Sequence, residues 1–107
     1  GKNGIFAIVV AMHIPPRTDG IAPHGTVEGY GRQSEKLLGI LKRHRTDMVV
    51  CGHEHMQLAE DWDGIRVVVS GGAGAPLMPL QRYGYYRVDV DGKGVRETFL
   101  PVKPAKP

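Results

Sequence analysis

Apolar residues form three runs along the chain that are typical of buried β-strands. The run from Ile5 to Met12 is continuous and rich in β-branched residues, so it predicts a central strand that is covered on both faces. Two shorter runs of the same kind, Met48–Cys51 and Ile65–Ser70, predict two further strands. Each of the three runs stops abruptly, at His13 and its prolines or at a glycine.

The remaining periodic segments predict one helix and a hairpin. Residues Ser34 to Arg45 carry their leucines on one side and their charges elsewhere, which predicts an amphipathic helix. The segments Tyr83 to Val90 and Val95 to Leu100 are β-rich and are joined by Asp91-Gly92-Lys93-Gly94, a strong hairpin signal. These elements predict an α/β fold class, with a mixed β-sheet and one main helix.

Composition supports a folded chain. The chain has 107 residues, of which 41% are apolar and 23% charged, close to the globular average. We expect one domain over residues 1–100 and a flexible tail over 101–107, where proline alternates with lysine and alanine. The longest apolar run is too short to cross a bilayer, so no membrane partner is expected.

Charge and cysteine usage narrow the function only a little. The net charge of +3 is mild, and the one dense basic cluster is Lys42-Arg43-His44-Arg45 at the end of the predicted helix. Cations there complement the helix dipole, and this interpretation is preferred over a nucleic-acid-binding surface that also uses Lys36. Cys51 is the only cysteine, so an internal disulfide is excluded and the compartment in which the protein works stays unassigned.

Residues suited to metal binding follow the predicted strands. His13 follows the first strand, Gly52-His53-Glu54-His55 the second, and the glycine turn Gly71 to Gly74 the third. In open α/β sheets, ligands collect at the carboxyl ends of the strands. Two histidines separated by one residue on an extended stretch point to the same side, so His53 and His55 can converge on one metal centre or on an adjacent pair.

Other candidates are weaker. A lone histidine beside a strand is usually a hydrogen-bonded residue without a metal, and this would be the interpretation of His13 if it were considered without the other motifs. His24, in a long loop, and His44, at the helix end, are not taken as ligands. The glycine turn lacks nucleotide-binding spacing and is expected to let the backbone pass close to the site. Four aromatic residues are expected to serve packing: Trp62, Tyr83, Tyr85 and Tyr86.

In this order, the motifs resemble the C-terminal half of the calcineurin-like metallophosphoesterases. The resemblance runs through three segments, Val9 to Pro16, Val49 to His55 and Val67 to Gly74, and extends from Ile5 to about Leu100. It implies half of a two-sheet α/β sandwich flanked by helices. It also implies hydrolysis of a phosphomonoester or phosphodiester by metal-activated water.

The resemblance implies specific ligands. His13 and His53 would bind one metal and His55 the other, in a pair of divalent ions such as Mn, Fe or Zn, which suit imidazole. Such a pair would bind the phosphate oxygens and activate a bridging water. No catalytic residue is assigned within these 107 residues.

The chain departs from the family pattern in one large respect. The Asp-x-His, Gly-Asp and Gly-Asn-His-(Asp/Glu) motifs of the family do not occur in it. We therefore expect a fragment that is inactive alone, binds at most one ion weakly, and associates with the missing N-terminal half or with itself through exposed sheet surface. Two alternatives stay open: a stand-alone non-catalytic metal-binding or assembly module, and a nucleic-acid-binding domain.

Overall fold

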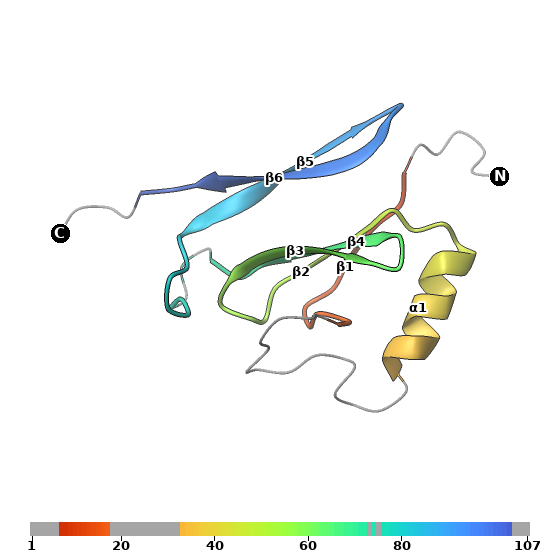
Figure 1. The fold of residues 1–107 in the computed structure, drawn as a ribbon, viewed down its shortest axis with the longest axis horizontal. Coiled ribbons are helices and arrows are strands. Elements are labelled where there is room, and N and C mark those ends of the chain that lie inside the picture. The colour runs from red at the N-terminus through yellow and green to blue at the C-terminus, as the bar shows by residue number, and fades with distance from the viewer. Residues whose placement is uncertain (1–6, 18–32, 73, 75, 104–107) are drawn as a thin grey trace.

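The computed structural model describes residues 7–17, 33–72, 74 and 76–103 (Figure 1). Within them, strands and one helix follow in the order β1 (Val9–Ala11), α1 (Gln33–Arg43), β2 (Met48–Cys51), β3 (Gln57–Trp62), β4 (Ile65–Ser70), β5 (Gly84–Asp91) and β6 (Gly94–Pro101). No helix in this part of the chain is long and apolar enough to cross a membrane.

Four of the strands form one sheet in the order β1-β2-β4-β3. Strands β1, β2 and β4 run parallel, with Val10 beside Val49 and Val50 beside Val68. Strand β3 pairs with β4 in the antiparallel sense. The sheet is therefore mixed, and together with α1 it confirms the predicted α/β class.

Strand β1 differs from its prediction. It is only three residues long, and it lies at an edge of the sheet with β2 as its neighbour. Val9, at 41%, and Ala11 are exposed whereas Val10 between them is half-buried, so one face of β1 is uncovered. The prediction of a central strand covered on both faces is therefore wrong for the described residues, and residues 5–6 of the predicted run lie outside them.

Helix α1 packs against one face of the sheet. Side chains on that face come from alternate positions of the strands, because successive residues of a strand point to opposite sides. Leu41 of α1 is buried in one cluster with residues of three strands: Val49, Cys51, Trp62, Ile65, Val67 and Val69. The predicted helix is confirmed by α1, which ends two residues before its predicted end at Arg45.

The end of α1 is a Schellman motif with arginine at the left-handed position. Arg45 has φ +56°, and its N–H donates to the carbonyl of Lys42 at 3.1 Å. The N–H of Thr46 donates to the carbonyl of Leu41 at 2.9 Å, so carbonyls of the last turn have partners. Glycine is the usual residue at this position, because it has no Cβ to strain the backbone.

The hairpin β3–β4 was not predicted. Strand β3 is polar apart from Leu58, Ala59 and Trp62, so its sequence lacks a β-branched run. The overlooked signal is Asp63-Gly64, which joins the paired residues Trp62 and Ile65 with positive φ angles of 52° and 91°. Asp-Gly is typical of a two-residue turn in which both residues have positive φ.

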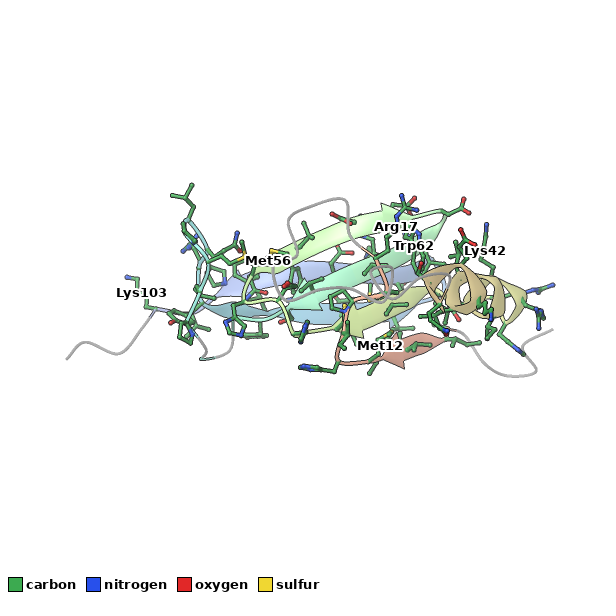
Figure 2. All side chains as sticks on the ribbon, turned by 90° about the horizontal axis from the view of Figure 1, so that it is seen from below. Met12, Arg17, Lys42, Met56, Trp62 and Lys103 are labelled. Carbon is green, nitrogen blue, oxygen red and sulfur yellow. The ribbon has the colours of Figure 1, made fainter. Side chains whose placement is uncertain are left out.

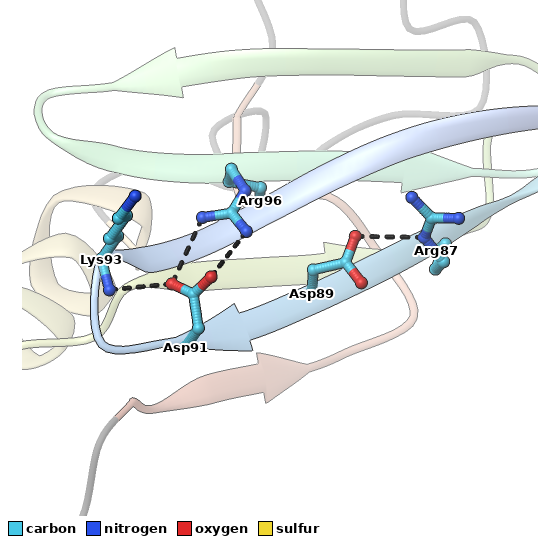
Figure 3. Close-up of polar contacts among 5 residues, drawn as sticks. All are labelled: Arg87, Asp89, Asp91, Lys93 and Arg96. Atoms are coloured by element: carbon cyan, nitrogen blue, oxygen red, sulfur yellow. Dashed lines mark hydrogen bonds and ion pairs between the residues drawn. The ribbon is translucent and has the colours of Figure 1, made fainter.

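The predicted C-terminal hairpin is confirmed by β5 and β6, which pair from Gly84 and Pro101 to Asp91 and Gly94. Figure 3 shows ion pairs on this hairpin, where Arg96 contacts both oxygens of Asp91, at 3.3 and 2.7 Å, and Arg87 contacts Asp89 at 3.1 Å. All four side chains are well exposed, so these pairs add little stability.

The hairpin is tied to the sheet face opposite α1. Arg66 alternates with the core-facing residues of β4 and therefore points away from α1. Its guanidinium makes two parallel bonds to Glu97 of β6, at 2.8 and 3.0 Å. The strands β5 and β6 lie on the other side of the sheet from α1 in Figure 1. Of the expected tail, Pro101 is part of β6, and residues 104–107 lie outside the described residues.

Candidate metal site

The carboxyl ends of β1, β2 and β4 meet at one edge of the sheet, because these three neighbouring strands are parallel. Hydrogen bonds continue the pairing of β1 and β2 beyond the strand ends. The N–H of Met12 donates to the carbonyl of Val50, and the N–H of Gly52 donates to the carbonyl of His13, both at 3.0 Å. This bonding holds His13 against the start of the Gly-His-x-His segment.

The imidazole rings of His13 and His53 are in contact. Nε2 of His13 lies 3.1 Å from Nδ1 of His53, and the ring centroids are 4.9 Å apart with an edge-on angle of 77°. In a metal-free pair, one of these nitrogens carries the hydrogen and the other accepts it. The His13 side chain is exposed and that of His53 is half-buried, so the pair is accessible from solvent.

The spacing of the two nitrogens fits a shared metal ion. Two imidazole nitrogens on one tetrahedral ion, each about 2.0–2.1 Å from it, lie about 3.3 Å apart. The 3.1 Å between His13 and His53 is close to that separation. Both atoms are neutral imidazole nitrogens in their metal-binding form, and imidazole suits Zn and Fe. His13 and His53 therefore fit as two ligands of one divalent ion.

His53 occupies an unusual backbone conformation. Its φ is +69°, and the N–H of Glu54 donates across it to the carbonyl of Gly52 at 2.8 Å. A three-residue turn of this kind is rare and strained in a non-glycine residue. The segment is thus bent and not extended, so the sequence-based reason for His53 and His55 pointing to the same side is wrong, although the turn still directs His53 to His13.

His55 belongs to the same bent segment and anchors a second loop. Its carbonyl accepts a hydrogen bond from the N–H of Met78 at 3.0 Å. Among the described residues, no group of three His, Cys, Asp or Glu side chains is close enough to hold a metal ion. The structure thus brings His13 and His53 together without grouping His55 with them in a single three-ligand site.

Gly71 supports the turn from the end of β4. A Cβ on Gly71 would lie 1.6 Å from the carbonyl oxygen of Glu54, so only glycine fits here. The N–H of Gly71 also donates to the carbonyl of Met56 at 2.9 Å. Close backbone approach at the glycine turn was predicted, and Gly71 shows it, while residues 73 and 75 lie outside the described residues. Glu54, which stands between His53 and His55 in the sequence, is fully buried. The sequence alone did not predict this burial.

The remaining cysteine, histidine and aromatic side chains considered in the sequence have other environments. Cys51 is buried, its Sγ donates to the carbonyl of Val68 at 3.3 Å, and burial raises the pKa of the thiol to about 12. His44 is exposed at the end of α1, and His24 lies outside the described residues. Trp62 packs in the core and Tyr86 contacts Phe99, whereas Tyr85 is half-exposed.

Comparison with known proteins yields a structural likeness only. The fold is similar to that of a predicted phosphoesterase. This is a conserved uncharacterized protein from Streptococcus pneumoniae TIGR4, with a TM-score of 0.44 and 16% sequence identity. The likeness covers 67% of this chain and 49% of the other, so the chain spans about half the length of that protein. No family model and no curated protein matches the sequence.

Proposed function

We propose that this chain contributes histidine ligands to a phosphoesterase that depends on two divalent metal ions. One observation carries the proposal: a histidine at the end of β1 and the first histidine of Gly-His-x-His at the end of β2 place ring nitrogens 3.1 Å apart. In the proposed enzyme, a phosphomonoester or phosphodiester is hydrolysed at this edge of the sheet.

The ligand roles are those that the family resemblance implies. His13 and His53 would hold one ion, through Nε2 and Nδ1, and His55, which is not grouped with them among the described residues, would be a ligand of the second ion. Gly71 fixes the backbone of Glu54 and so keeps the two histidines on either side of it in place. When bound, the ion pair supplies Lewis acidity and an activated water.

The chain does not carry every group that such a reaction needs. Two divalent ions near each other repel strongly, and a bridging carboxylate normally makes the pair tolerable. The sequence contains neither the aspartate-bearing motifs of this enzyme class nor a histidine in a Gly-Asn-His motif for protonating the leaving group. We therefore propose that these groups come from a preceding segment of a longer protein, and that residues 1–107 alone bind at most one ion weakly.

Hydrolysis of p-nitrophenyl phosphate and bis-p-nitrophenyl phosphate with added Mn²⁺ tests this function. The longer chain, with the preceding segment, should hydrolyse one of them and lose that activity in His53→Ala and His55→Ala. His44→Ala, a histidine at the helix end, is the matched control and should retain activity. Full activity of both site variants would refute the proposed ligand roles.

Several apolar side chains of the chain are exposed, which favours a further segment or a partner that covers them. Val9 at the edge strand is 41% exposed, and Tyr85 and Val90 of β5 are 52% and 49% exposed. Exposed apolar surface drives association, so residues 1–107 alone are expected to self-associate. Light scattering should show oligomers at high concentration that disappear in the longer chain, and a clean monomer of residues 1–107 would contradict this expectation.

A further inference from the structure

A hollow lies between the loop before β5 and the residues after β6. It is an open depression with a volume of about 340 Å³, and it is lined by Leu77, Gln81, Arg82, Tyr83, Val102 and Lys103. This volume falls at the lower end of the range for small-molecule sites, about 300–1,000 Å³. We propose that the hollow binds a small organic anion that has an aromatic or other apolar body. The inference does not rest on the proposed hydrolase function.

The lining combines apolar surface with positive charge, the two properties that such a ligand needs. Leu77, Tyr83 and Val102 provide apolar surface, and Val102 is 51% exposed and free to be covered. Arg82 and Lys103 are both exposed cations on the same hollow. An apolar body thus gains burial, and the two cations at the hollow attract its anionic group.

These two cations differ from four others in the described part of the chain. Lys42, Arg66, Arg87 and Arg96 are each paired with a carboxylate. Neither Arg82 nor Lys103 forms such a pair with a described residue. Because no internal carboxylate competes for them, an anion can bind there without breaking an existing ion pair. The charge of the hollow therefore favours an anionic ligand over a neutral one.

The walls of the hollow are held by hydrogen bonds before any ligand arrives. The side-chain oxygen of Gln81 accepts from the N–H of Gln57 at 2.8 Å, and the N–H of Gln81 donates to the carbonyl of Met78 at 3.2 Å. On the other side, the N–H of Val102 donates to the carbonyl of Tyr83 at 2.9 Å. A site whose walls are already ordered loses less conformational entropy on binding.

Binding of 2-naphthalenesulfonate tests the proposal, because it combines an aromatic body with a charge that cannot be hydrolysed. The protein is kept metal-free with a chelator, and binding is followed by amide chemical shifts and calorimetry. Naphthalenesulfonate should shift the amides of residues 77, 81–83, 102 and 103. Inorganic sulfate has the anionic charge without the aromatic body, and 2-naphthol has the aromatic body without the charge. Both should bind at least tenfold more weakly.

Two charge variants make the test specific. Arg82→Gln and Lys103→Gln should each weaken binding about fivefold, as expected for an exposed ion pair. Arg43→Gln removes an exposed cation from α1 and should leave the affinity unchanged. Figure 2 shows Lys42, its neighbour on α1, and Lys103 at opposite ends of the molecule. Unchanged affinity in the Arg82→Gln, Lys103→Gln double variant, or equal binding of naphthol, would overturn the proposal.

Discussion

Nε2 of His13 lies 3.1 Å from Nδ1 of His53, although the two residues are 40 positions apart in the sequence. Parallel pairing of β1 with β2 causes this proximity, because it aligns the ends of both strands at one edge of the sheet. The strained turn at His53 then directs its ring back to His13. Strain of this kind persists only where the surrounding structure holds it, and it concentrates at functional sites.

Metal titration tests this pair directly. The chain should bind Zn²⁺ or Mn²⁺ weakly, and both His13→Ala and His53→Ala should lower the affinity by more than about tenfold, since even changes outside the ligand shell cost that much. Isothermal titration calorimetry at neutral pH measures the affinities. His44→Ala, which removes an exposed histidine from the helix end, should bind as the wild type does. Equal affinity in all four proteins would reject the assignment.

Gly71→Ala should destabilise the fold and the site together. The new methyl group would lie 1.6 Å from the carbonyl oxygen of Glu54 and 2.7 Å from its carbon, so backbone must move. Overpacking of side chains costs about 1–3 kcal/mol, and a backbone conflict belongs at the upper end of that range or beyond. Urea denaturation should show this loss, accompanied by weaker metal binding.

Gly52→Ala is the matched control for that substitution. A Cβ on Gly52 would meet its nearest atom, the carbonyl oxygen of Ser70, at 3.7 Å, which is an ordinary contact. It should therefore cost much less stability than Gly71→Ala. Equal losses in the two variants would show that the close approach at Gly71 is not what requires glycine there.

The proximity of His13 and His53 agrees with the sequence-based expectation, but their local geometry was not predicted. His13 and Gly52-His53-Glu54-His55 follow strongly apolar strands, so their meeting at one sheet edge follows from the parallel order. The turn at His53 could not be predicted, because a positive φ in histidine goes against the local preference of the residue and depends on Glu54 packing on Gly71. The edge position of β1 was missed because an apolar run predicts a buried strand without indicating which elements lie beside or above that strand.

Arg45→Gly should stabilise the chain. Arg45 has φ +56° at the position of the Schellman motif where glycine is favoured, and its left-handed conformation costs about 1 kcal/mol. Glycine removes that strain but gains more freedom in the unfolded chain, so the net gain should be about 0.5 kcal/mol. Thermal unfolding should show a small rise in Tm. Arg43→Gly, within α1, should lower it, and the same sign for both variants would contradict the structure.

The bidentate pair of Arg66 and Glu97 should make stability depend on pH. Hydrogen bonding to Arg66 is the largest cause that lowers the pKa of Glu97 below its ordinary value of 4.5. A carboxyl whose pKa is lower in the folded state stabilises the fold above its ordinary pKa, and this stability is lost as the pH falls through the folded value. The loss should therefore begin near pH 4.5 and continue below it.

Glu97→Gln isolates this contribution. Side-chain exposure is 37% for Arg66 and 17% for Glu97, so solvent screens the pair and the expected loss at pH 7 is only about 1 kcal/mol. Urea denaturation of the variant and the wild type at pH 7 and pH 3 should show this difference at the higher pH and a smaller one at the lower. Arg66→Lys keeps the positive charge but loses the fork of two donors. Its stability loss relative to wild type should therefore be smaller than that of Glu97→Gln at pH 7, and it should likewise shrink at pH 3. A difference between Glu97→Gln and wild type that is as large at pH 3 as at pH 7 would mean that Glu97 acts through packing and not through its charge.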